Sequence, residues 1–82
     1  MKRDTSKPRD PLSEMVAVES SSLRAVGYVA RAALLDVTFQ HGSTYRYLEV
    51  PPEVYHGLLR ADSKGRYFNE RVKAAFSYVR LS

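Results

Sequence analysis

Residues 33–50 read ALLDVTFQHGSTYRYLEV, two alternating segments on either side of a turn that contains a glycine. From residue 33 to residue 39 every second residue is apolar, and most of the residues between them are polar. This alternation has the two-residue period of a β-strand. After the turn, Tyr45 and Tyr47 lie on one side of the returning segment and Arg46 on the other. The pattern predicts an antiparallel hairpin with one face in the core and one face nearer to water.

The length of the turn decides which face Tyr45 and Tyr47 occupy. With a three-residue loop (40–42) and a left-handed Gly42, the tyrosines stand opposite the apolar residues of the first strand and belong to the core. With a two-residue loop (41–42), they stand opposite its polar residues and are available to a ligand. The longer loop is favoured because it makes the apolar face consistent across both strands. The expected aromatic core is Phe39, Tyr45, Tyr47 and Phe68.

The segments around the hairpin complete a small α+β domain. Residues 15–30 are strand-like, with Gly27 marking a bulge or a close backbone approach. After Val50, two prolines end the sheet and open a helix that continues to about Ala61. Ser63 is a candidate cap for a second helix, and residues 76–81 alternate like a last short strand. We expect an antiparallel sheet of three to four strands with two helices packed on one face.

The first 13 residues differ in composition from the rest of the chain. They contain two prolines and almost no apolar residues, so we expect a disordered basic and polar tail over residues 1–13 and a single domain over residues 14–82. The chain has no Cys, which excludes disulfides and thiolate metal sites. No apolar run approaches membrane-spanning length and no signal peptide is evident, so we expect a cytoplasmic protein without a membrane partner.

The positive charge is concentrated near the C-terminus. Of the formal net charge of +4, residues 60–82 carry all, with six Lys and Arg against two Asp and Glu. A basic end on a nearly neutral body suggests an anionic partner, most often nucleic acid, and the alternative is a solvated helix face that keeps the protein soluble. The candidate nucleic-acid-binding residues are Lys64, Arg66, Tyr67, Arg71, Lys73 and Arg80.

Residues of the kinds used in catalysis are present but not in a catalytic pattern. His41 and His56 have no spacing to each other or to a carboxylate that specifies a catalytic dyad, a triad or a metal site. We therefore expect no catalytic residue, no metal and no cofactor. Residues 63–65 either offer backbone N–H groups to one phosphate at a helix start or only mark the helix boundary.

Residues 18–81 resemble the KTSC domain, a module named for its occurrence at the C-terminus of some lysyl-tRNA synthetases and also found as a small bacterial or phage protein. The resemblance is carried by motifs along nearly the whole folded part of the chain. They are Val18, Ser20-Ser21, Leu23 to Tyr28, Leu35-x-Val37-x-Phe39-x-x-Gly42-x-x-Tyr45-x-Tyr47, Val50-Pro51, Val54-Tyr55, Leu58, Ala61-x-Ser63-Lys64-Gly65, Phe68-Asn69 and Tyr78-x-Arg80-Leu81.

The resemblance implies a suggested role in RNA binding and no catalytic residue. Together with the basic C-terminal residues, it predicts a non-catalytic module that binds RNA or single-stranded nucleic acid weakly. The alternative is a protein-interaction module or accessory subunit with no nucleic-acid ligand, which would use an exposed sheet edge or the basic helix. An unpaired sheet edge is compatible with either a monomer or a weak homodimer.

Overall fold

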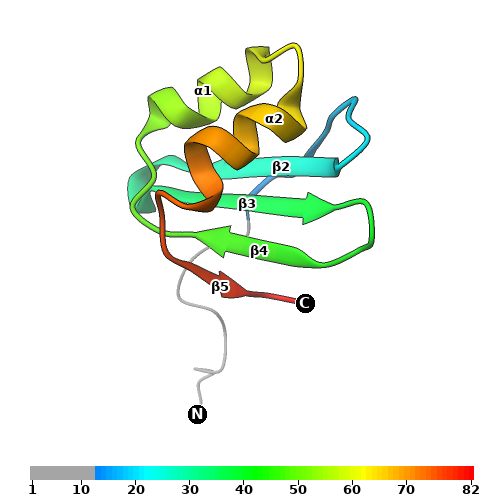
Figure 1. Ribbon diagram of the computed structural model, residues 1–82. Helices are drawn as coiled ribbons and strands as arrows, with labels where there is room; N and C mark the ends of the chain where they lie inside the picture. Colours follow the sequence, from blue (N-terminus) through cyan, green and yellow to red (C-terminus); the bar gives the residue numbers. More distant parts are fainter. Residues whose placement is uncertain (1–12) are drawn as a thin grey trace.

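The structure is a computed structural model that describes residues 13–82 of the chain. Over these residues it forms one antiparallel sheet of five strands in the order β1-β2-β3-β4-β5, with the helices on one face (Figure 1). The strands are β1 (Val16–Ala17), β2 (Leu23–Val29), β3 (Leu34–Phe39), β4 (Thr44–Tyr47) and β5 (Tyr78–Arg80). The helices are a 3-10 turn η1 (Ala30–Ala32), α1 (Pro52–Arg60), α2 (Lys64–Phe68) and a π-helix η2 (Asn69–Lys73).

The expected α+β class is confirmed, with five strands in place of three to four. The additional strand is β1, only two residues long, which pairs Val16 with Val26 and Ala17 with Ala25. A two-residue strand is too short to show a period of two, so its pairing follows from its position beside β2.

The β3–β4 hairpin has the longer loop. Tyr45 pairs with Val37 and Tyr47 with Leu35. The N–H of Gly42 donates to the carbonyl of Phe39 at 2.8 Å, and Gly42 has a φ of 106°, which a residue without a side chain adopts at no steric cost. The two tyrosines therefore lie on the apolar face, the face that the helices cover.

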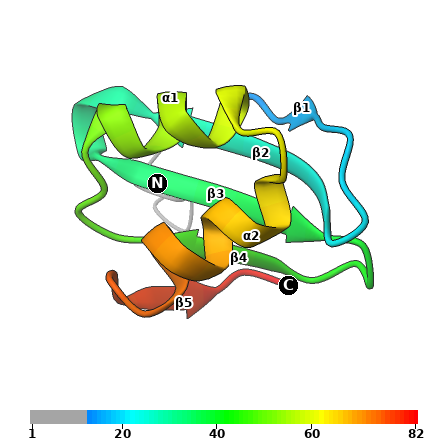
Figure 2. The ribbon, with the colours of Figure 1, turned by 45° about the horizontal axis from the view of Figure 1, so that its top comes forward.

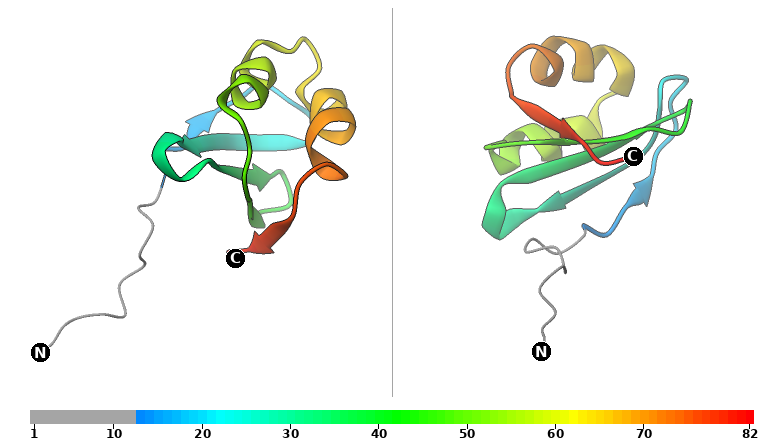
Figure 3. Two further views of the ribbon diagram at one scale, coloured as in Figure 1. Left: turned by 90° about the vertical axis from the view of Figure 1, so that its left-hand side faces the viewer. Right: turned by 90° about the horizontal axis from the view of Figure 1, so that it is seen from below.

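The core lies between that face and the helices. Figures 2 and 3 show α1 and α2 side by side over the same face of the sheet. Leu58 of α1 is buried, and so are Phe68 of α2 and Val72 of η2, whose spacing of four places them on one side of the helical segment. They meet the buried sheet residues Leu23, Val26, Leu35, Val37 and Tyr47, and Val50.

The starts of α1 and α2 have clear local causes. Pro51 is extended and Pro52 occupies the first turn of α1, where no N–H is needed. The Ser63 hydroxyl accepts a hydrogen bond from the N–H of Arg66 at 3.3 Å, so Ser63 caps α2 as expected. Within residues 13–82, no helix is both long enough and apolar enough to cross a membrane.

The polar face of the hairpin is drier than the alternation predicts. Asp36 and Arg46 are only 2% and 8% exposed. Residues 13–15 cross this face at Gly27, where an added Cβ would lie 2.9 Å from the carbonyl oxygen of Glu14. Gly27 is thus the close backbone approach that its position in a strand indicates. The tail expected over residues 1–13 lies outside the described residues except for Ser13, whose hydroxyl donates to Asp36 at 2.6 Å.

Candidate nucleic-acid interface

The structure distributes the five predicted cations over one continuous helical segment and the last strand. Lys64, Arg66, Arg71 and Lys73 lie on α2 and η2, and Arg80 lies on β5. All are exposed except Lys64, which is half-buried and donates from Nζ to the carbonyl of Ala61 at 2.9 Å. Among residues 13–82, the ion pair within 4 Å is that of Arg46 with Asp36, so none of these five cations is paired with an Asp or Glu side chain of the described residues.

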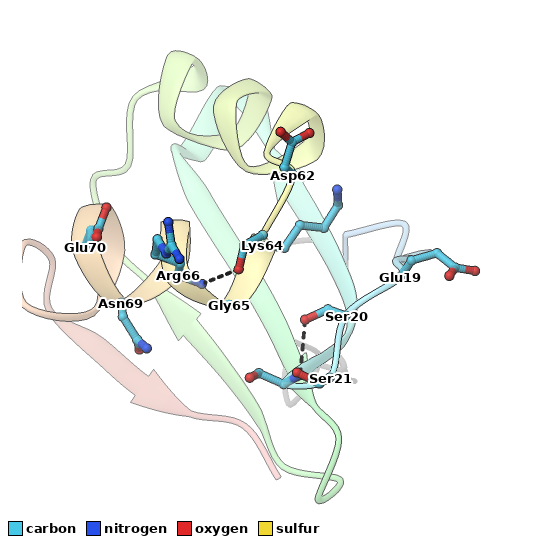
Figure 4. Close-up of a pocket in the computed structure, with 11 residues that line it drawn as sticks. Glu19, Ser20, Ser21, Asp62, Lys64, Gly65, Arg66, Asn69 and Glu70 are labelled. Carbon is cyan, nitrogen blue, oxygen red and sulfur yellow. Dashed lines mark hydrogen bonds between the residues drawn. The ribbon is translucent and has the colours of Figure 1, made fainter.

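Lys64 and Arg66 line a hollow between the loop of residues 19–22 and the start of α2, shown in Figure 4. We call it the serine hollow, and its volume is about 610 Å³. Loop and helix approach closely here, since an added Cβ at Gly65 would lie 3.0 Å from the Ser22 hydroxyl. The lining residues are Glu19, Ser20, Ser21, Ser22, Asp62, Ser63, Lys64, Gly65, Arg66, Asn69 and Glu70.

The serine hollow is not electropositive. Its two cations, Lys64 and Arg66, are accompanied by three carboxylates, those of Glu19, Asp62 and Glu70. The Ser20 hydroxyl accepts hydrogen bonds at 3.1 Å from the backbone N–H groups of residues 22 and 23, so it stabilises its own loop. The formal balance of two positive against three negative charges weakens this hollow as an anion site.

Tyr67 serves as a contact between the two helices. Its hydroxyl donates to the carbonyl of Val54 at 3.1 Å, and its phenol end packs where a side chain at Gly57 would be. The guanidinium of Arg71 lies 5.5 Å from the centre of the Tyr67 ring, within cation–π range. Tyr67 is therefore half-buried between α1 and Arg71, so less of its ring is exposed for stacking on a base than a nucleic-acid-binding residue would offer.

Lys73 and Arg80 lie beside a second, aromatic hollow that shares no lining residue with the serine hollow. Its volume is about 340 Å³. We call it the aromatic hollow, and its lining residues are Phe39, His41, Tyr45, Tyr47, Phe68, Lys73 and Tyr78. The pairing of β4 with β5 places Tyr78 beside Tyr47 and Arg80 beside Tyr45.

The four residues expected in the aromatic core differ in burial. Tyr47 and Phe68 are 3% and 4% exposed, whereas Phe39 and Tyr45 are half-buried and pack against the core from the aromatic hollow. Burial, together with the smaller effects of the neighbouring phenols of Tyr78 and Tyr45, raises the pKa of the Tyr47 hydroxyl to about 12. The Tyr47 phenol is therefore neutral at physiological pH.

Arg66 and Lys73 line different hollows although they are seven residues apart, a spacing that places residues on one side of a regular α-helix. The reason is η2, a π-helical turn that takes in more residues per turn than an α-helix. The wider turn rotates the residues that follow it relative to those before it. Lys73 consequently faces the aromatic hollow, and Arg66 faces the serine hollow.

Two residues of the aromatic hollow were absent from the predicted site. Tyr78 is 53% exposed and stacks on Tyr45, with ring centres 5.0 Å apart. His41 is exposed and stacks on Phe39 at 5.5 Å. The alternation of Tyr78 with Arg80 indicates that both side chains face the same way. Their pairing with β4 cannot be predicted from the sequence, because two helices separate β4 from β5 along the chain.

The two histidines lie on separate elements. His41 is in the β3–β4 turn, and His56 is on α1 beside Tyr55, with ring centres 5.9 Å apart. In the part of the chain that the structure describes, no three His, Asp or Glu side chains gather in a group of the kind that holds a metal ion.

Residues 19–76 match the KTSC domain family. The chain belongs to this family. A crystal structure of a KTSC domain protein from Yersinia pestis has the same fold, with a TM-score of 0.81 and 30% sequence identity over 87% of this chain and 100% of that chain.

Among the proteins similar to this chain, two are small proteins and others are large enzymes that contain a similar segment. A protein from Tsukamurella paurometabola is 48% identical over 82% of this chain and 100% of its own length. An uncharacterized protein from Stutzerimonas stutzeri is 53% identical over 71% of this chain and 82% of its own length. A lysine–tRNA ligase from Nostoc punctiforme is 34% identical over 96% of this chain, which spans only 14% of the ligase.

Proposed function

We propose that this KTSC chain is a non-catalytic module that binds RNA or single-stranded nucleic acid in the cytoplasm, as a monomer or weak homodimer. The observation that carries the proposal is the set of exposed cations on the helical segment and β5, Arg66, Arg71, Lys73 and Arg80, which form no ion pair with an Asp or Glu side chain of the described residues. A cation without an ion-pair partner breaks no existing ion pair when it binds a phosphate. Its binding releases counterions from the nucleic acid, which favours association.

The relatives support the same class of ligand. Lysine–tRNA ligases of Nostoc punctiforme, Nostoc sp. and Trichormus variabilis contain a segment like this chain, and their name states that they act on tRNA. A domain carried by an enzyme of tRNA is in a position to contribute contacts to the RNA backbone. Because most contacts to a nucleic-acid backbone carry no sequence information, we expect binding that depends weakly on sequence.

Salt dependence tests the proposal directly. Fluorescence anisotropy with a labelled single-stranded RNA should show binding at 50 mM salt and a loss of roughly 50-fold in affinity at 200 mM salt if about four phosphates are engaged. The charge reversals Arg66→Glu and Lys73→Glu should each weaken binding. Arg31→Glu is the matched control, because Arg31 lies in η1, at the end of the sheet away from the start of α2 (Figure 1). Absence of binding at 50 mM salt, or an affinity independent of salt, overturns the proposal.

A protein-interaction module is the second candidate, favoured by the apolar side chains on both edges of the sheet. Val16 beside β2 and Val79 on β5 are 48% and 47% exposed. Edge strands with unpaired backbone groups can add a strand from a partner. This candidate predicts that the chain binds no RNA and that a partner protein is still retained by the Arg66→Glu and Lys73→Glu variants.

A further inference from the structure

The aromatic hollow has the composition of a ligand site. Six of its seven lining residues carry aromatic rings, and the seventh is Lys73. Its volume of about 340 Å³ falls within the range of small-molecule sites, roughly 300–1,000 Å³, which are mostly apolar with a few placed polar groups. The hollow therefore has room for one flat ring system.

The rings in the hollow form a floor and a rim. Tyr47 and Phe68 are buried and meet edge to face, with ring centres 5.5 Å apart, so they form the floor. Tyr78 and His41 are exposed at the rim, and each stacks on a half-buried ring beneath it. A rim ring that is held by stacking but open to solvent loses little conformational entropy when a further ring packs against it.

The charge beside the aromatic hollow is positive. Lys73 is part of its lining, and the guanidinium of Arg80 lies 5.9 Å from the centre of the Tyr45 ring. Arg80 is held in place by donating to the Ser43 hydroxyl at 3.0 Å and to the main-chain oxygen of Ser82 at 2.8 Å. No carboxylate is among the lining residues, in contrast to the serine hollow.

We propose that the aromatic hollow binds one unpaired base of a single-stranded nucleic acid, with the base against Tyr78 and a neighbouring phosphate on Lys73 and Arg80. This inference rests on the proposed function and adds to it the position at which a base is held. Aromatic faces accept any base by stacking, and cations beside them neutralise the backbone. The site is thus selective for unpaired over paired strands and tolerant of sequence.

The test combines a change in the protein with a change in the nucleic acid. The ligands are a labelled single-stranded octanucleotide and an octanucleotide of the same backbone whose bases are removed. The variants are Tyr78→Ala and Tyr78→Phe, and the measurement is affinity by fluorescence anisotropy at 50 mM salt. We expect Tyr78→Ala to bind the normal octanucleotide roughly 5- to 150-fold more weakly, and Tyr78→Phe, which keeps the ring, to restore most of the affinity. Towards the abasic strand, wild type and Tyr78→Ala should bind alike.

Each other outcome has a definite meaning. Equal binding of the normal and abasic strands by wild type overturns the base site and leaves the proposed function standing. Absence of binding to either strand overturns both. Sedimentation without nucleic acid tests whether the chain forms a dimer. If it does, and Tyr78→Ala abolishes the dimer, the hollow is an interface with a second copy of the chain, and the base site is overturned. If Tyr78→Ala does not fold, Lys73→Ala is the second probe, since Lys73 is exposed and is proposed to hold the phosphate, and an unchanged affinity for the normal strand overturns the proposal.

Discussion

The Asp36 carboxylate and the Arg46 guanidinium form a bidentate ion pair between β3 and β4. Arg46 donates from Nε to Oδ1 at 2.8 Å and from Nη2 to Oδ2 at 3.0 Å, between residues that pair directly across β3 and β4. The Ser13 hydroxyl adds a third donor to the same carboxylate. The pair lies on the face away from the helices and lines neither hollow, so its role is structural.

Removing one partner of this ion pair should destabilise the protein more than replacing both partners with apolar residues. Asp36→Ala leaves the buried Arg46 guanidinium without its carboxylate, and we expect the free energy of unfolding to fall by about 3–5 kcal/mol. The double variant Asp36→Leu, Arg46→Met replaces both charges with apolar groups, so it should lose far less. Urea unfolding followed by circular dichroism measures both. Equal losses in the single and double variants would show that the ion pair is not the reason for the cost.

A side chain at residue 27 should displace the segment that crosses the polar face. In Gly27→Ala the new Cβ would lie 2.9 Å from the Glu14 carbonyl oxygen and 2.9 Å from the Met15 sulfur. We expect a loss of about 1–3 kcal/mol in stability and faster amide exchange at Val16 and Ala17, because β1 follows this segment directly. Amide exchange by NMR distinguishes the two effects, and unchanged exchange in β1 would contradict the expected displacement.

Stability should fall above pH 10 because of Tyr47. An unfolded tyrosine ionises near pH 10, whereas burial raises the pKa of Tyr47 to about 12. The unfolded state therefore loses its proton first, and the stabilisation that is complete below pH 10 is lost between pH 10 and 12, by about 2–3 kcal/mol. Tyr28 and Tyr55 also have raised pKa values, so Tyr47→Phe is the matched comparison. The stability of wild type relative to Tyr47→Phe should decline over this range, and a constant difference would refute the prediction.

Neutralising Lys73 should change the salt dependence of nucleic-acid binding by about one contact. For a single strand, each phosphate contact contributes a slope of about −0.7 in the plot of log affinity against log salt concentration. Lys73→Gln should therefore reduce the slope by about 0.7, and Arg31→Gln should leave it unchanged. Affinities at four salt concentrations give the slopes. A slope that is the same for wild type and Lys73→Gln places the backbone contacts elsewhere.

Local patterns predict the hairpin, the two helices and the cap at Ser63 because each depends on residues close together in the chain. The register of Tyr45 and Tyr47 is also predictable, since it follows from the loop length and from the apolar residues opposite. The burial of Asp36 and Arg46 is not predictable from alternation. It depends on residues 13–15, which cross the sheet at Gly27 and remove the polar face from water.

The chain alone determines the α+β class and the basic character of its C-terminal quarter, because composition and short periodicities decide both. Only the tertiary structure places Lys64 and Arg66 at one hollow and Lys73 at the other. The π-helical turn of η2 separates Lys73 from Arg66, and the return of the chain to β4 after two helices brings Tyr78 and Arg80 beside Tyr45. The contacts of Tyr78 and Arg80 with Tyr45 join residues more than thirty positions apart, and no local pattern encodes such packing between distant segments.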